Sequence, residues 1–286
     1  MTVYPELAGK VAVVTGGGRR GGLGEAIARR LAHEGVRVVL HDLGAIGDAT
    51  APAHGVAARD ELEATAAAIR QSSGAPVATF TGDMRNEADV AALLRHAVAT
   101  FGRLDIVINN AGVGYLFGSL LETTQERWDT VHHVNLRGPF FAIKHAGLLM
   151  REQPEHPGWG RGRIINIASK AAKSASLYTG AYTASKHGLI GLTRAAAVEL
   201  GPLGINVNAV CPNHVTTGLG LWQNEFMAGR RGLSVDDYLQ AMRARIPLGR
   251  VGLPDDTANA CAFLCSAQAV YITGEALNVS GGEEYH

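Results

Sequence analysis

Val11-Ala12-Val13-Val14-Thr15-Gly16-Gly17-Gly18-Arg19-Arg20-Gly21-Gly22-Leu23-Gly24 is the stretch that decides the fold. Its β-branched apolar start predicts a buried strand over 11–15, and apolar residues recur at helical spacing over 23–34. The glycines between them let the backbone turn sharply and approach a ligand closely. A helix N-terminus after such a turn offers free N–H groups and a positive dipole end to a phosphate. This order of strand, glycine turn and helix therefore predicts a dinucleotide pyrophosphate site.

The alternation of strand and helix continues along the whole chain. Short apolar runs predict strands, and longer runs of helical period predict helices. Strands alternating with helices form βαβ units with right-handed crossovers and a parallel sheet. We therefore predict a single α/β domain over 1–286, a Rossmann-type doubly wound parallel sheet of about seven strands with helices on both faces. The expected strands are 11–15, 36–41, 76–81, 104–109, 163–168, 205–210 and 276–279, and the expected helices 23–34, 61–71, 88–100, a long helix within 124–150, 180–200 and 255–266.

Two stretches fall outside this alternation. Residues 43–59 follow the second strand, are rich in Gly, Ala and Pro, and read as an insertion. Residues 217–247 lie between the sixth strand and the last helix, and we predict that this irregular stretch is a substrate lid. No arginine cluster marks a carboxylate or phosphate site in this stretch beyond four residues for which solvent exposure is the alternative; they are Arg230, Arg231, Arg243 and Arg245.

Composition excludes several classes of function. The 286 residues carry 26 basic and 26 acidic side chains, and this balance argues against a general nucleic-acid or anionic-membrane binder. No apolar run approaches the roughly 18 residues of a membrane span, and residues 1–10 do not resemble a secretory signal. The three cysteines, Cys211, Cys261 and Cys265, form neither a disulfide framework nor a metal-ligand set. A cytoplasmic protein with a small-molecule partner and no metal is expected.

Asp42 closes the second predicted strand and bears on the cofactor. A carboxylate there accepts hydrogen bonds from ribose hydroxyls and repels a 2′-phosphate, which favours NAD. Arg19 and Arg20 argue for NADP, because guanidinium groups bind phosphate well. The position of Asp42 is better defined, and NAD is therefore the predicted cofactor.

A Tyr-Lys pair carries the predicted chemistry. Tyr182 and Lys186 are four residues apart and share a helix face, and Ser169 lies upstream of them. A phenol titrates near pH ~10, and a nearby ammonium is expected to lower that pKa toward working pH. Tyr-x-x-x-Lys alone is also common as a surface pair, so the weight rests on the surrounding motifs.

Together these residues resemble the classical short-chain dehydrogenase/reductase family over nearly the whole chain. The glycine turn, Asp83, Asn109-Asn110-Ala111-Gly112, Asn135, Ser169 and the Tyr182–Lys186 pair match family motifs in order. Tyr178 is one helical turn from the matching position. Pro212-Asn213-His214-Val215-Thr216-Thr217 resembles the family turn over the nicotinamide, and 246–250, 272–274 and 280–282 resemble its C-terminal signature.

The resemblance implies roles for these residues. The catalytic set would be Asn135, Ser169, Tyr182 and Lys186, with Ser169 bonding the substrate oxygen, Tyr182 as general acid or base, Lys186 binding ribose and Asn135 holding a relay water. Tyr115 and His214 would border the pocket, and Trp222 is a candidate to line it. The cofactor would be held by Gly16, Gly22, Leu23, Gly24, Asp42, Asp83, Asn110, Tyr182, Lys186, Pro212, Val215 and Thr217.

Two departures from the family pattern bear on the pyrophosphate geometry and on the substrate, respectively. The glycine turn has two extra residues, and the 43–59 insertion resembles the hydroxyacyl and steroid branch, while the C-terminal end is similar to polyol dehydrogenases. A secondary alcohol such as a polyol, sugar or cyclic alcohol comes first, and a 3-hydroxyacyl or steroid substrate second. An inactive dinucleotide sensor and an epimerase or dehydratase that retains its cofactor are rival functions. The resemblance also implies a homotetramer.

Overall fold

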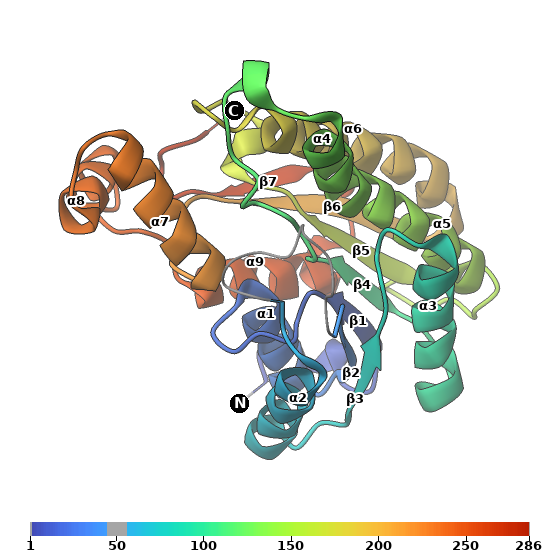
Figure 1. The fold of residues 1–286 in the computed structure, drawn as a ribbon. Helices are drawn as coiled ribbons and strands as arrows, with labels where there is room; N and C mark the ends of the chain where they lie inside the picture. Colours follow the sequence, from blue (N-terminus) through green and yellow to red (C-terminus); the bar gives the residue numbers. More distant parts are fainter. Residues whose placement is uncertain (1, 45–55, 286) are drawn as a thin grey trace.

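The computed structural model describes residues 2–44 and 56–285 and contains one parallel sheet of seven strands. The strands are ordered β3-β2-β1-β4-β5-β6-β7, so the chain moves outward from β1 to one edge and then returns to β4 on the other side of β1 (Figure 1). Their bounds are β1 (Val11–Thr15), β2 (Arg37–Asp42), β3 (Val77–Thr81), β4 (Ile106–Asn109), β5 (Gly162–Ile167), β6 (Ile205–Pro212) and β7 (Ala276–Val279). All pairs are parallel, as predicted.

Helices cover both faces of the sheet because successive strand residues point to opposite sides. In β1, Ala12 and Val14 pack in one apolar cluster, while Val11 and Val13 pack in another. Helices α1 (Leu23–His33), α2 (Arg59–Ser73) and α9 (Pro254–Cys265) bury their apolar sides in the first cluster. Helices α3 (Glu87–Phe101), α5 (Gly138–Met150) and α6 (Gly180–Leu200) do so in the second. The doubly wound Rossmann-type architecture is therefore confirmed.

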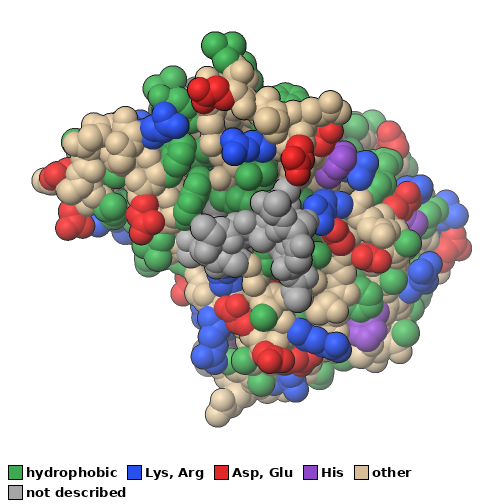
Figure 2. Space-filling model, in the orientation of Figure 1, with side chains coloured by type: hydrophobic (Ala, Val, Ile, Leu, Met, Phe, Trp, Pro, Cys, Tyr) green, Lys and Arg blue, Asp and Glu red, His purple; other side chains and the backbone are tan. Residues whose placement is uncertain are grey.

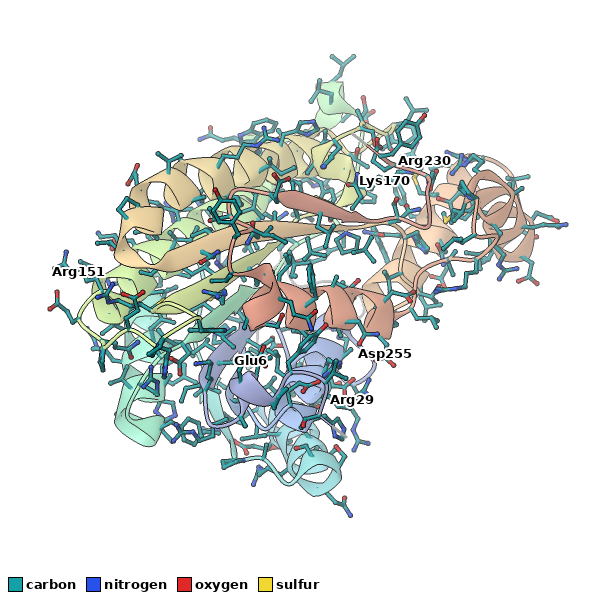
Figure 3. The ribbon with its side chains drawn as sticks, turned by 180° about the vertical axis from the view of Figure 1, so that it is seen from behind. Glu6, Arg29, Arg151, Lys170, Arg230 and Asp255 are labelled. Carbon is teal, nitrogen blue, oxygen red and sulfur yellow. The ribbon has the colours of Figure 1, made fainter. Side chains whose placement is uncertain are left out.

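Polar contacts fasten the first helical layer. The Arg29 guanidinium of α1 lies 2.7 Å from the Asp255 carboxylate of α9, and the Glu6 carboxylate accepts a 2.8 Å hydrogen bond from the Ala267 amide (Figure 3). Within the described part of the chain, no helix combines the length and apolarity that a membrane crossing requires.

The helix predicted within 124–150 is present, but a wider turn interrupts its regular α geometry. The structure has α4 (Gln125–His132), a π-helical turn over His133–Arg137, and then α5. In this turn the Gly138 amide donates to the His133 carbonyl, five residues back. Pro139 has no N–H to donate to Asn135, four residues back, and its ring excludes regular α geometry there. The wider turn follows from this proline.

The prediction that 217–247 is irregular is wrong. Two helices form there, α7 (Gly218–Arg230) and α8 (Val235–Arg245), and they stand out from the body of the molecule (Figure 1). Side chains cap both, since Thr217 Oγ1 accepts from the Gly220 amide and Ser234 Oγ accepts from the Asp237 amide. The pair buries its own apolar cluster, which includes Met227, Ala228, Tyr238, Met242 and Ile246. Most of the 43–59 insertion, residues 45–55, lies outside the described residues.

Candidate active site

A cavity of about 760 Å³ lies at the carboxyl ends of the strands. It includes the point between β1 and β4 where the strand order reverses, the usual ligand site of open α/β sheets. Strand ends bring distant residues together here, among them Gly16, Asp42, Asn110, Ser169 and Pro212. Of the predicted site residues, Gly24 and Asn135 do not line the cavity and the others do.

The glycine turn is packed as tightly as its sequence suggests. Gly16 has φ +66°, a left-handed conformation that favours glycine, and an added Cβ there would lie 2.7 Å from Ala111 Cα. A Cβ on Gly24 would lie 2.4 Å from the Gly16 carbonyl oxygen. Asn110 Nδ2 donates to the carbonyls of Thr15 and Gly16, at 2.9 Å each. Gly24 therefore allows α1 to pack closely against the turn, and Asn110 holds the turn by hydrogen bonds.

Asp42 is held in place by the backbone around it. Its Oδ2 accepts from the Gly18 amide at 2.9 Å, and its Oδ1 accepts from the Leu43 amide at 2.8 Å. These bonds fix the position of the carboxylate in the cavity lining. Arg19 lines the same cavity. Asp83 lies on the same wall, where its carboxylate pairs with the Arg85 guanidinium at 2.8 Å.

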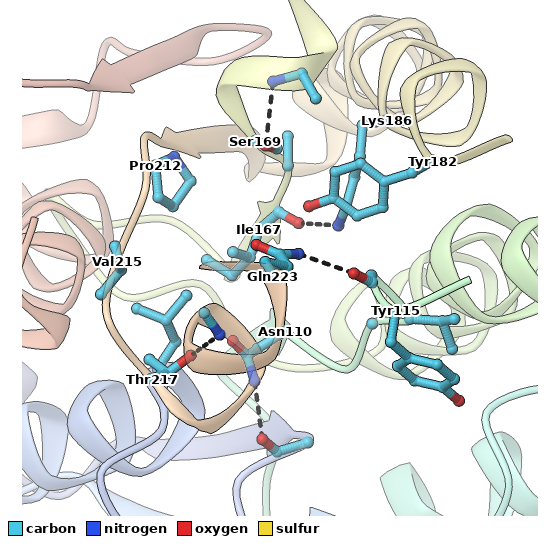
Figure 4. A pocket seen from close by; sticks show the side chains of 18 of the residues that line it. Asn110, Tyr115, Ile167, Ser169, Tyr182, Lys186, Pro212, Val215, Thr217 and Gln223 are labelled. Atoms are coloured by element: carbon cyan, nitrogen blue, oxygen red, sulfur yellow. Dashed lines mark hydrogen bonds between the residues drawn. The ribbon is translucent and has the colours of Figure 1, made fainter. Parts of the chain in front are cut away.

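Ser169, Tyr182 and Lys186 meet at one wall of the cavity (Figure 4). Ser169 follows β5 and its Oγ accepts from the Ala171 amide at 3.1 Å. Lys186 is 4% exposed, and its Nζ donates to the Ile167 carbonyl at 2.7 Å and lies 5.7 Å from the centre of the Tyr182 ring. Helix α6 supplies both Tyr182 and Lys186, and their spacing places them on one side of it.

The predicted fall in the pKa of Tyr182 is wrong for this structure. Burial raises the pKa of the phenol, and its hydrogen bond with Ser169 acts in the opposite direction without cancelling the effect. Burial also lowers the pKa of the Lys186 ammonium to about 8. The ammonium forms its hydrogen bond to a backbone carbonyl, and the pKa of Tyr182 is set by burial, Ser169 and Cys211.

Asn135 is fully buried in the π-helical turn. Its Oδ1 accepts from the Val113 amide at 2.7 Å, and its Nδ2 donates to the Val113 carbonyl at 2.9 Å and to Ser185 Oγ at 3.2 Å. The side-chain amide thus ties α4–α5 and α6 to the loop after β4. The side chain is thus bonded within the protein, and Asn135 does not line the cavity.

The structure adds an aromatic cluster that no sequence motif signals. Phe117, in the loop after β4, lies edge-on to Tyr182, with ring centres 6.0 Å apart. It also contacts Trp222 and Phe226 of α7, whose rings stack at 5.3 Å. Trp222 therefore supports the cavity wall without lining it, whereas Phe117 lines it. Figure 2 shows hydrophobic side chains gathered between the α7–α8 segment and the body of the molecule.

One further bond joins α7 to the opposite wall. Gln223 Nε2 donates to the Gly114 carbonyl at 2.8 Å (Figure 4). Tyr115 and His214 line the cavity, as the resemblance implied. Burial, with a contribution from Lys170, lowers the pKa of His214 to about 4, so its imidazole is neutral at neutral pH.

Comparison with known proteins identifies relatives along the full chain. A family model described as enoyl-(acyl carrier protein) reductase matches residues 16–284. A short-chain dehydrogenase/reductase from Armillaria gallica is 38% identical over 274 residues, covering 96% of this chain and 95% of that one. The 2-(S)-hydroxypropyl-CoM dehydrogenase 3 of Xanthobacter autotrophicus is 36% identical over 280 residues, covering 96% and 97%.

Solved structures agree with these relatives. Levodione reductase superposes with a TM-score of 0.83 at 31% identity, over 96% of this chain and 98% of that one. NAD⁺-bound xylitol dehydrogenase gives 0.84 at 30% identity, over 97% and 100%. The fold, the ordered motifs and these relatives show that this chain is an oxidoreductase of the classical short-chain dehydrogenase/reductase family.

Proposed function

We propose that this protein transfers a hydride between NAD(H) and a secondary alcohol or its ketone. The observation that carries the proposal is the convergence of Ser169, Tyr182 and Lys186 on the cavity that the glycine turn and Asp42 also line. A proton donor and a dinucleotide cradle in one cavity are what this reaction requires.

The cofactor end fits a dinucleotide. Gly22, the N-cap of α1, provides no side-chain cap, so within the described structure the first amides of the helix stay available to an anion. Gly22 and Leu23 line the cavity at this point. The anchored Asp42 carboxylate supports NAD over NADP, because a 2′-phosphate would meet a fixed negative charge. Arg19 on the same wall is the feature that supports NADP.

The bound nicotinamide would supply the hydride acceptor or donor. Ser169 would donate a hydrogen bond to the substrate oxygen. Tyr182 would give that oxygen a proton in reduction and take one in oxidation. Lys186, with a pKa of about 8, is largely protonated at neutral pH, and its charge would stabilise the phenolate as it forms. The side-chain amide of Asn135 is bonded within the protein. Its backbone carbonyl receives no hydrogen bond from Pro139, which has no N–H. We therefore assign the relay water to the backbone carbonyl of Asn135.

The cavity near Tyr182 supports a substrate with an apolar body. The cavity wall includes the apolar side chains of Val113, Phe117, Val134, Met227 and Met242, and the centre of the Phe117 ring lies 6.0 Å from that of Tyr182. Among the secondary alcohols that the sequence favours, this wall suits a cyclic alcohol better than an open polyol. A 3-hydroxyacyl or steroid substrate is the second candidate, since the same wall could take an acyl chain or fused rings.

The test is a spectrophotometric screen of NADH formation with cyclic alcohols and polyols, repeated with NADP. Tyr182→Phe removes the proton donor and keeps the ring, so kcat should fall on the order of 10²–10⁴ while NAD affinity is retained. Tyr178→Phe, four residues earlier in the turn before α6 and outside the cavity lining, is the matched control and should keep its turnover. Unchanged kcat in the Tyr182 variant would refute the assignment. Tight NAD binding without turnover on any alcohol would favour the sensor, or an enzyme that retains its cofactor.

We also propose that residues 1–286 form one domain in which 217–247 acts as the lid, and that the protein is a homotetramer. An apolar groove between α5 and α6, lined by Ile143, Leu148 and Leu192 among others, supports pairing through these helices. Light scattering on a sizing column measures the assembly, and a monomer would contradict it.

A further inference from the structure

The end of the cavity under α8 carries more positive than negative side chains. Three cations line it, Lys170, Arg231 and Arg245, against two carboxylates, Glu283 and Glu284. Lys170 follows Ser169 directly, so this charged end begins beside the predicted catalytic wall. Figure 3 shows Lys170 at the α7–α8 end of the molecule. Of the four arginines in 217–247, Arg231 and Arg245 line the cavity, whereas Arg230 and Arg243 do not.

Glu283 cannot neutralise the cations that reach it. Its Oε1 lies 2.7 Å from Lys170 Nζ and 3.6 Å from Arg245 Nε, and its Oε2 accepts from Asn213 Nδ2 at 2.6 Å. Although burial acts to raise it, hydrogen bonds from Lys170 and Asn213 lower the pKa of Glu283, which therefore stays ionised. One carboxylate faces two cations. Among the described residues, the long Nε contact is the one ion pair of Arg245, so its outer N–H groups remain available.

Tyr238 adds a neutral donor at the same place. Tyr238 is 7% exposed and lines the cavity, and the Arg231 guanidinium lies 5.3 Å from the centre of its ring. Burial raises the pKa of Tyr238, while Arg231 and Arg245 act to lower it. The phenol is therefore protonated at neutral pH with two guanidinium groups close by. A hydroxyl donor beside a guanidinium with available N–H groups can bind an anion through hydrogen bonds from both.

We propose that the substrate carries a carboxylate remote from its reacting carbon, and that Arg245 and Tyr238 bind it with Lys170 behind them. This inference rests on the proposed function and specifies its substrate class. The planar guanidinium fork matches a carboxylate in shape. The excess of one cation over the carboxylates at this end matches a monoanion rather than a phosphate dianion. The substrate would then be an apolar, ring-sized hydroxy acid or keto acid, with its carbonyl at Tyr182 and its acid under α8.

The first experiment compares 4-oxocyclohexanecarboxylate with its methyl ester as oxidants of NADH. We expect a higher kcat/KM for the acid in the wild type. In Arg245→Gln the ratio of acid to ester kcat/KM should fall about 5- to 10-fold. This is the low end of the loss expected for a charged hydrogen bond, because Arg245 is half-exposed and solvent screens its charge. The change should reside in KM for the acid. Arg243→Gln, on the same helix but outside the cavity lining, should keep the wild-type ratio. Equal ratios in the wild type and both variants would overturn the proposal.

A second measurement separates this inference from the proposed function. Binding of cyclohexanecarboxylate, which has no carbonyl to reduce, is followed by calorimetry in the presence of NADH. Binding that weakens in Arg245→Gln and Tyr238→Phe but not in Arg243→Gln supports the anion subsite even where neither ketone is reduced. Turnover of the ester together with identical carboxylate binding in all variants would leave the oxidoreductase proposal standing and remove the subsite.

Discussion

Gly24 at the start of α1 is the tightest point of the cofactor end. A Cβ there would lie 2.4 Å from the Gly16 carbonyl oxygen and 2.6 Å from Asn110 Nδ2. Since non-bonded carbon atoms rest about 3.5 Å from their neighbours, Gly24→Ala should force α1 and the turn apart by roughly 1 Å. Overpacking costs about 1–3 kcal/mol, and alanine returns up to about 1 kcal/mol in helix propensity. We expect the free energy of unfolding to fall by about 2 kcal/mol.

The same shift should weaken NAD binding. Displacing the first amides of α1 by roughly 1 Å removes at least one charge-assisted hydrogen bond, so Kd should rise about 10- to 100-fold. Urea unfolding followed by circular dichroism measures the stability, and calorimetry measures NAD binding. Gly229→Ala in α7 is the control, because its added Cβ meets no atom within 4 Å. A Gly24 variant with wild-type stability and NAD affinity would refute the packing argument.

Two more perturbations test the site. Lys186 has a pKa of about 8 in the folded protein against an ordinary 10.5, so the folded state binds fewer protons between these values and stability should rise with pH across that window. In Lys186→Met, the free energy of unfolding measured with urea should rise less between pH 7.5 and 10 than in the wild type. The rise that remains would come from buried Lys10, whose pKa is also about 8. The same pH dependence in both proteins would contradict the burial of the Lys186 charge. Gln223→Leu removes the bond from α7 to the Gly114 carbonyl, and KM for the alcohol should rise about 3- to 10-fold without a change in NAD affinity. An equal loss of NAD affinity would mean that α7 acts on the cofactor instead of the substrate.

Local patterns were sufficient for the architecture. The β-branched runs and the helical spacing between them predicted seven strands in the observed positions, because burial on both faces demands continuous apolar strands. Pro139 carried the information for the π-helical turn, through the hydrogen bond that it cannot donate.

Other features depend on contacts between residues far apart in the chain. Gln223 meets Gly114, Glu283 meets Lys170, and Phe117 meets Trp222, and no local pattern links these partners. The helices α7 and α8 were missed because their stabilising apolar cluster forms mainly between the two helices.

The sequence alone determined the family, the positions of the strands and of the helices that cover the sheet, and the identity of the residues at the predicted site. The tertiary structure decided the environment of those residues: the pKa of Tyr182 rises, the Asn135 amide is occupied, and α8 brings Arg245 and Tyr238 to the cavity. The reason is that hydrogen-bonding periodicity is local to a segment, whereas desolvation and charge balance depend on every segment that packs around a group.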